Sequence, residues 1–287
     1  MPNYLPTNDL LFKKMFTSKD SMHILKAFVR DVLGKEFKRL TPRETYHIDS
    51  YKQTFEEQTQ LMYTEVDVLA EDEEGRHVTI EMQIQPHDFF LERSLFYLTE
   101  AYRSPLGNQE VKDFVSDNNF SALRPAYGIN ILSFHLFDRH ETALRRFSLM
   151  DLVTHDTLRT KHDEELVLLC FFSLKNQNIP VDSATYHWQQ FFNTGEVADN
   201  APDYLKEAKR KTDYYSLDEE EQIMITKMDK AKMINDAVMS TALREAREEG
   251  LEAVAMNMLK ENEPLEKIAK YTNLTLEQIK EMKSNLG

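Results

Sequence analysis

The clearest regular pattern in the chain is an alternation of apolar and polar residues over residues 77–85, which read HVTIEMQIQ. A period of two predicts a strand with one face in a core and a polar opposite face. Residues 61–70 (LMYTEVDVLA) predict a neighbouring strand, and residues 46–55 are a weaker strand candidate. The polar run EDEEG between the two stronger strands predicts the turn of a hairpin.

Helical patterns lie on both sides of this hairpin. Residues 10–34 predict two helices, and residues 89–103 predict a third before an apolar strand at 126–137. Beyond about residue 145 the chain is expected to be mainly helical, with a long charged helix over 218–249. This mixture predicts an α/β fold, a mixed sheet flanked by helices with a helical C-terminal extension.

Three parts are expected along the chain: a core over residues 1–145, a helical extension over 146–249 and a small helical tail over 250–287. In the tail, Thr275 and Gln278 have the spacing of a capping box. The stretch IAKYTNLTLEQI resembles a helix-turn-helix, and a small packing or oligomerisation module is the alternative. The apolar residues expected to share a small core there are Leu265, Ile268, Leu274, Leu276 and Ile279.

Composition narrows the class of protein. Hydrophobic residues make up 41% of the chain and charged residues 29%, which is enough for a real core in a soluble protein. No apolar run reaches the roughly 18 residues that a membrane helix needs. The single cysteine, Cys170, lies in the apolar run LVLLCFFSL and is expected to be a buried thiol. These features favour a cytoplasmic protein without a membrane anchor.

The net charge of −14 argues against broad, tight DNA wrapping, since such binding depends on neutralising phosphates with basic residues. The negative net charge is compatible with a magnesium site, because magnesium prefers carboxylate oxygens. Glu81 and Gln83 lie two apart on the predicted strand and share a face. A turn centred near Glu73 pairs Asp67 with Thr79 or Glu81, so the two carboxylates would be neighbours. The alternative is a solvent-facing hairpin with ordinary surface acids.

Residues 62–102 (MYTEVDVLAEDEEGRHVTIEMQIQPHDFFLERSLFYLTEAY) resemble the core of the Rpn family of recombination-promoting nucleases, which are PD-(D/E)xK-type transposases. The opening TNDLLFKKMF is similar to the start of that family. So is the order of a D-x-V strand, a hairpin, an I-E-M-Q strand and an R-x-x-x-Y helix. The resemblance covers roughly residues 5–140. It implies a restriction-endonuclease-like core that cleaves DNA with magnesium, or manganese as the alternative metal.

The resemblance also implies roles for particular residues. Asp67 takes the aspartate position and Glu81 the (D/E) position, so both would bind the metal together with the carbonyl of Met82. Gln83 stands where the broader superfamily has lysine. Glutamine can neither act as a base nor carry a positive charge, but it can orient water by hydrogen bonds. Gln83 is therefore expected to be catalytic in that orienting role.

Arg93 and Tyr97 lie four apart, so they share one helix face that could contact phosphate. A plain salt bridge and a packed ring are the alternatives for these two side chains. The expected function is a magnesium-dependent DNA endonuclease linked to recombination or mobile elements, with DNA as partner and homo-oligomerisation open. The alternative is a catalytically degenerate nuclease fold that binds DNA or protein.

Overall fold

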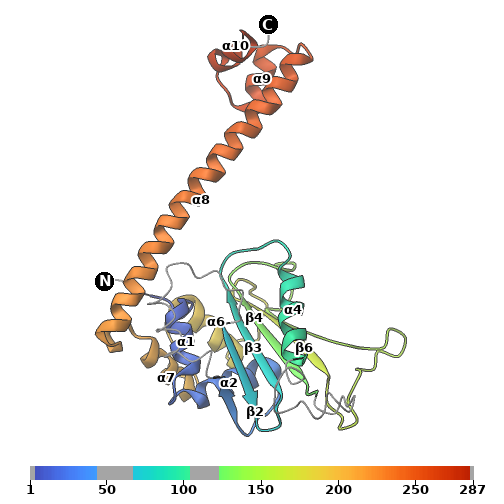
Figure 1. The fold of residues 1–287 in the computed structure, drawn as a ribbon, viewed down its shortest axis with the longest axis vertical. Helices are drawn as coiled ribbons and strands as arrows, with labels where there is room; N and C mark the ends of the chain where they lie inside the picture. Colours follow the sequence, from blue (N-terminus) through green and yellow to red (C-terminus); the bar gives the residue numbers. More distant parts are fainter. Residues whose placement is uncertain (1–3, 44–66, 104–122, 285–287) are drawn as a thin grey trace. The chain divides into compact units, whose positions relative to one another are not determined.

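The computed structural model describes residues 4–43, 67–103 and 123–284 (Figure 1). The weaker strand candidate at 46–55 and the first part of the 61–70 strand lie outside these residues. The chain divides into two compact units, Met1–Asp218 and Glu219–Gly287.

The first unit is built on one mixed sheet. Its strands are β1 (Leu40–Pro42), β2 (Val68–Asp72), β3 (His77–Gln83), β4 (Ala126–Leu132), β5 (Leu144–Ser148) and β6 (Val167–Ser173). Their order across the sheet is β1-β2-β3-β4-β6-β5. The β3–β4 and β4–β6 pairs are parallel, and the other pairs are antiparallel. The predicted α/β class, a mixed sheet flanked by helices, is confirmed.

Helices cover both faces of the sheet (Figure 1). They are α1 (Asp9–Thr17), α2 (Met22–Leu33), α4 (Phe90–Arg103), α6 (Ala184–Thr194) and α7 (Asp203–Thr212). One face packs against α1, α2, α6 and α7 in a large core that contains Ile80 and Trp188, both 0% exposed. The opposite face packs against α4, where Leu98 and Ala101 contact Leu169 of β6. A short turn of helix, Tyr214–Ser216, ends the unit.

Because helices cover both faces of the sheet, the polar positions of the alternating pattern in β3 are buried as well as the apolar ones. Val78 and Ile80 point into the large core as predicted. Thr79 and Glu81 point the other way, yet they are also buried, at 6% and 8% exposure, because α4 lies over them. The polar face of this strand is therefore an interior surface and not a solvent-facing one.

The expectation of a mainly helical chain after residue 145 is wrong for β5 and β6. The run around Cys170 forms β6, which lies between β4, its parallel neighbour, and β5, its antiparallel neighbour, and helices cover both of its faces. Such a strand is a continuous apolar run, which hydrophobic periodicity cannot distinguish from a buried helix. Cys170 is fully buried as expected, and burial raises the pKa of its thiol to about 12. The predicted extension 146–249 accordingly does not form a unit of its own.

The second unit consists of α8 (Glu219–Lys260), α9 (Leu265–Thr272) and α10 (Leu276–Ser284). It begins at residue 219, whereas the sequence placed the start of the tail at residue 250, because α8 continues through Gly250 without a break. The small core contains the buried residues Ala255, Leu259, Ile268 and Ile279. Leu276, expected in this core, is 40% exposed. Among the described residues, no helix is long and apolar enough to cross a membrane.

The predicted capping box at the start of α10 is present. The backbone N–H of Thr275 donates to Oε1 of Gln278 at 2.9 Å, and the N–H of Gln278 donates to Oγ1 of Thr275 at 3.2 Å. Each side chain thus satisfies a backbone donor that the helix leaves unpaired.

The tail core yields a prediction that the single tryptophan can test. Ile268→Asp places a charge in that core, at a cost of about 4 kcal/mol, so α9 and α10 should unfold. Trp188 lies in the core of the first unit, so its fluorescence-detected melting transition should stay within about 2 °C of the parent's. Circular dichroism should meanwhile report the lost helix. A parallel fall of the tryptophan transition would show that the two units are not independent.

Candidate active site

The register of β2 and β3 brings two acidic residues together. Val68 pairs with Ile80, so Asp67, which directly precedes β2, stands opposite Glu81. The turn that fixes this register is held by Asp72, whose Oδ1 accepts the N–H groups of Glu74 and Arg76 at 2.8 and 2.9 Å. Of the two predicted pairings, the structure has the one that makes Asp67 and Glu81 direct neighbours across the hairpin.

Asp67 is held from two directions. Its Oδ2 accepts the backbone N–H of Met82 at 2.7 Å. Lys13 of α1 donates from Nζ to the backbone carbonyl of Asp67 at 2.8 Å, and the same Nζ lies 3.9 Å from Oδ1. These contacts fix the carboxylate, while 23% of the side chain remains exposed.

The carboxyl group of Asp67 is easier to protonate than an ordinary aspartate. Burial raises its pKa from 3.8 to about 7, and the nearby negative charge of Asp9 adds to the rise. The charge of Lys13 and the hydrogen bond from Met82 lower the pKa, and Glu81 raises it. Burial and the negative neighbours thus raise the pKa of Asp67 more than the positive charge and the hydrogen bond lower it. A bound cation would stabilise the charged form of the carboxylate in this environment.

Glu81 lies deeper, with 11% of its side chain exposed. Arg93 of α4 donates from one terminal nitrogen to Oε1 of Glu81 and to Oε1 of Gln83, both at 2.5 Å. Burial raises the pKa of Glu81, and the charge of Arg93 opposes that rise. Arg93 therefore bridges the two polar side chains that the sequence placed on one face of β3.

This ion pair is incompletely satisfied. Within the described residues, two buried side-chain polar atoms lack a hydrogen-bond partner, Oε2 of Glu81 and Nε of Arg93. A buried polar atom without a partner costs free energy. Both atoms belong to the same ion pair, so an additional ligand at this point has a physical reason to bind.

The remaining predicted side chains lie around Arg93. Its guanidinium carbon is 5.3 Å from the ring centre of Phe90 and 6.0 Å from that of Tyr97. The amide nitrogen of Gln83 donates to the backbone carbonyl of Gln85 at 2.8 Å. The salt bridge and the ring contact named as alternatives for Arg93 and Tyr97 are both present, and a phosphate contact remains a prediction.

Sequence reasoning missed two charged residues of this site, Asp9 and Lys13. They lie four apart on α1, within the opening TNDLLFKKMF, where the sequence predicts a helix and the resemblance gives neither residue a role. The sequence carries a signal, because Lys13 follows three apolar residues in LLFKKMF, and the structure buries it with six other residues of α1. A lysine within such an apolar helix needs a polar partner, and Asp67 provides it.

The donor set fits a hard divalent ion with few protein ligands. The described part of the chain holds no cluster of three or more His, Cys, Asp or Glu side chains suited to a metal. Two neighbouring carboxylates with waters and a phosphate match the coordination that magnesium commonly adopts. Oε2 of Glu81 gives this fit a structural basis. The carbonyl of Met82 as a third ligand stays a prediction.

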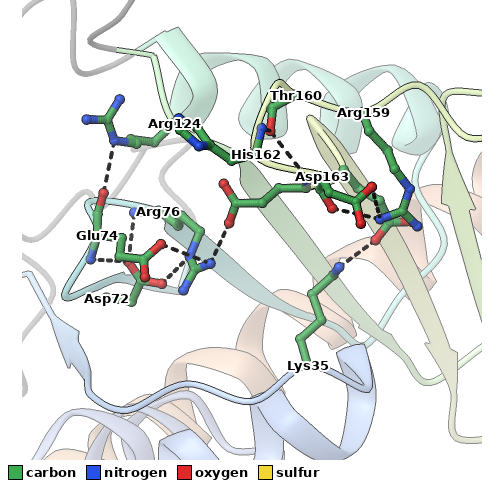
Figure 2. A network of polar contacts seen from close by, with 11 residues as sticks. Lys35, Asp72, Glu74, Arg76, Arg124, Arg159, Thr160, His162 and Asp163 are labelled. Carbon is green, nitrogen blue, oxygen red and sulfur yellow. Dashed lines mark hydrogen bonds and ion pairs between the residues drawn. The ribbon is translucent and has the colours of Figure 1, made fainter.

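A second polar network, shown in Figure 2, lies around the β2–β3 turn, at the opposite end of these strands from Glu81. Arg76 forms ion pairs with Asp72 and, at 2.6 Å, with Glu164. Lys35 forms another with Glu165 at 2.6 Å. The Arg76–Glu164 pair connects the turn to the segment before β6, and the Lys35–Glu165 pair connects that segment to the residues after α2, so the network holds parts of the fold together.

Comparison with known proteins agrees with this architecture. Residues 6–242 match the model of a family described as PD-(D/E)XK nuclease family transposase. The chain therefore belongs to the PD-(D/E)XK nuclease family transposases, as the sequence resemblance indicated. The match includes the whole sheet and ends within α8, so α9 and α10 lie outside it. No curated protein and no solved structure matched the chain.

The raised pKa of Asp67 predicts how metal-free stability depends on pH. Between pH 4 and 7 the folded protein keeps a proton that the unfolded chain has released, so the free energy of unfolding should fall as pH rises. A shift from 3.8 to about 7 corresponds to at most about 4 kcal/mol. Asp67→Asn should gain stability relative to the parent over this range and match it near pH 4.

Urea unfolding in EDTA at a series of pH values measures this difference. Asp88→Asn, at an exposed aspartate, controls for the loss of one charge. A stability difference between Asp67→Asn and the parent that does not change with pH would contradict the assigned environment.

Proposed function

We propose that this protein is a magnesium-dependent endonuclease that hydrolyses phosphodiester bonds in DNA. Family membership supports a nuclease or mobile-element role in general. The observation that supports the specific reaction is the pair of opposed carboxylates, Asp67 and Glu81, both with raised pKa. Two such groups side by side are unfavourable without a cation between them.

Each residue has a defined task in this proposal. Asp67 and Glu81 would hold the ion, with the carbonyl of Met82 as a further ligand. When bound, the ion lowers the pKa of a coordinated water and offsets charge on the leaving oxygen. The N–H of Met82 orients Asp67 for this task, since it fixes the second carboxylate oxygen at 2.7 Å.

Arg93 would change partners during the reaction. In the structure it bridges Glu81 and Gln83. If Glu81 bound a cation, the guanidinium would lose this partner and could donate to a phosphate oxygen. Gln83 would keep Arg93 at this position and orient water, in place of a cationic side chain. Tyr97 supports the guanidinium through its ring.

A catalytically degenerate module that binds DNA or protein is the second candidate. Gln83 favours it, because a neutral amide cannot supply charge to the transition state. The net charge of −14 favours it as well. The cytoplasmic location and homo-oligomerisation remain predictions in either case.

Metal-dependent stability and cleavage distinguish these candidates. Binding that is confined to the folded state raises stability by RT ln(1 + [L]/Kd), roughly 2.7 kcal/mol at a hundred times Kd. Magnesium or manganese should therefore raise the melting temperature of the parent by several degrees. Asp67→Asn should abolish this rise together with the nicking of supercoiled plasmid DNA.

Glu92→Gln is the matched control, because Glu92 is an exposed acid of α4 directly beside Arg93. It should keep both the metal response and the cleavage. A parent that binds metal without cutting DNA would identify the degenerate module, and an Asp67→Asn protein that cuts at the parental rate would remove Asp67 from the site.

A further inference from the structure

The outer surface of α4 carries two exposed aromatic residues that the carboxylate site does not use. Phe89 is 74% exposed and directly precedes the helix, and Phe96 is 59% exposed within it. Single exposed apolar residues are common on protein surfaces, so exposure alone assigns these two no function. What distinguishes the pair is the backbone at Phe89 and the position of both residues relative to Arg93.

Phe89 holds a backbone conformation that a bulky residue rarely adopts. Its φ is +62°, in the left-handed region, and its carbonyl accepts the N–H of Arg93 at 3.0 Å in the first turn of α4. Strain of this kind concentrates at functional sites. Packing does not compensate it here, because Phe89 is largely exposed. A ligand that contacts the ring supplies a reason for the conformation.

Both aromatic residues are neighbours of Arg93 along the helix. Phe89 lies four positions before Arg93 and Phe96 three positions after it, and residues at these spacings adjoin on a helix surface. Arg93 itself donates to Glu81 and to Gln83. The two exposed rings therefore belong to the turns before and after the side chain that connects α4 to the carboxylate pair.

Exposed rings beside a site for phosphodiester bonds fit nucleobases. Every base has a flat π-face that stacks on an aromatic ring whatever the sequence, and such stacking contributes strongly to the binding of single strands. In a duplex both faces of an internal base are covered by its neighbours, so a base stacks on a protein ring only where the strand is unstacked. Rings in this position therefore select unpaired bases.

The charges on α4 favour bases over phosphates as the groups bound at this surface. Asp88 and Glu92 are exposed acids directly beside Phe89 and Arg93 in the sequence. Acids disfavour the tracking of a duplex, because that mode of binding depends on neutralising phosphates with basic residues. Stacking on an aromatic ring does not need such neutralisation.

We propose that Phe89 and Phe96 form a stacking surface for unpaired bases, so that the substrate of this site is DNA with a single-stranded segment. The inference rests on the proposed nuclease function for its cleavage part. Its binding part depends only on the two rings, so the two parts can fail separately.

Fluorescence anisotropy of a short labelled oligothymidylate, titrated in EDTA, tests the binding part. Phe89→Asn removes the ring and tolerates the left-handed backbone, so the fold should be kept. The Kd should rise about 5- to 100-fold, the usual effect of losing one stacked base. Phe96→Leu keeps an apolar side chain without a π-face and should weaken binding similarly, whereas Phe96→Trp should bind at least as tightly as the parent.

Leu95→Gln is the matched control. Leu95 is an exposed aliphatic residue of the same helix, and it lies two positions from Arg93, so the two side chains do not face each other. This variant should bind the strand as the parent does. Binding that falls as much in Leu95→Gln as in Phe96→Leu would overturn the stacking surface, because any apolar contact would then suffice. The melting transition of Trp188 verifies that each variant is folded.

Light scattering tests the other occupant of such a surface, a second copy of the chain. The ring variants should keep the molecular mass of the parent. A changed mass in Phe89→Asn and Phe96→Leu, together with unchanged affinity for oligothymidylate, would show that the rings form a contact between copies and would overturn the proposal.

Single-turnover cleavage at saturating magnesium tests the substrate class. The parent should cut a duplex that contains a single-stranded gap at least about tenfold faster than the fully paired duplex, and Phe89→Asn should remove most of this preference. A parent that cuts both at one rate overturns the inference and leaves the nuclease proposal intact. If the parent cuts no DNA, the nuclease proposal fails. In that case binding of oligothymidylate that depends on the rings still supports the stacking surface, and absent or ring-independent binding overturns it.

Discussion

Repulsion between two partly buried carboxylates is the constraint on which the rest of the candidate site depends. Asp67 and Glu81 stand opposite each other because the β2–β3 turn fixes the register of the hairpin. Burial raises the pKa of both carboxyl groups, and at Asp67 the negative charges of Asp9 and Glu81 add to the rise. Such an arrangement persists in a folded protein only where surrounding groups compensate it.

The positive groups that compensate the two carboxylates come from helices on opposite faces of the sheet. Lys13 reaches Asp67 from α1, and Arg93 reaches Glu81 from α4 on the opposite face. Asn8 caps α1 by accepting the N–H groups of Leu10 and Leu11, and Lys13 lies among the buried residues by which the helix packs. The two cations hold the carboxylates without satisfying them fully, since Oε2 of Glu81 keeps no hydrogen-bond partner among the described residues.

Much of the hairpin could be predicted from the sequence, because its signals are local. The alternation over residues 77–85 and the polar turn before it were sufficient to place Asp67 and Glu81 on neighbouring strands. The burial of Glu81 could not be predicted this way, because it depends on α4 covering a face that reads as polar.

Features that depend on contacts between residues distant in the sequence could not be predicted from local patterns. The strand around Cys170 carries no alternation, since both of its faces are covered, and the sequence pattern therefore predicts a helical region there. The role of Lys13 depends on a contact across 54 positions of sequence. The sequence predicts Arg93 as a site residue because it lies within the motif that resembles the family. Its bridge between Glu81 and Gln83 depends on how α4 packs over β3, which the sequence does not predict.

The central claim is that Asp67 and Glu81 share one divalent cation. An anomalous difference map from crystals grown with manganese, recorded at the manganese absorption edge, tests it most directly. We expect one peak about 2.1 Å from a carboxylate oxygen of each residue, with Arg93 moved away from Glu81. The claim would be contradicted by crystals at saturating manganese that show no peak between the two carboxylates and retain the Arg93–Glu81 ion pair.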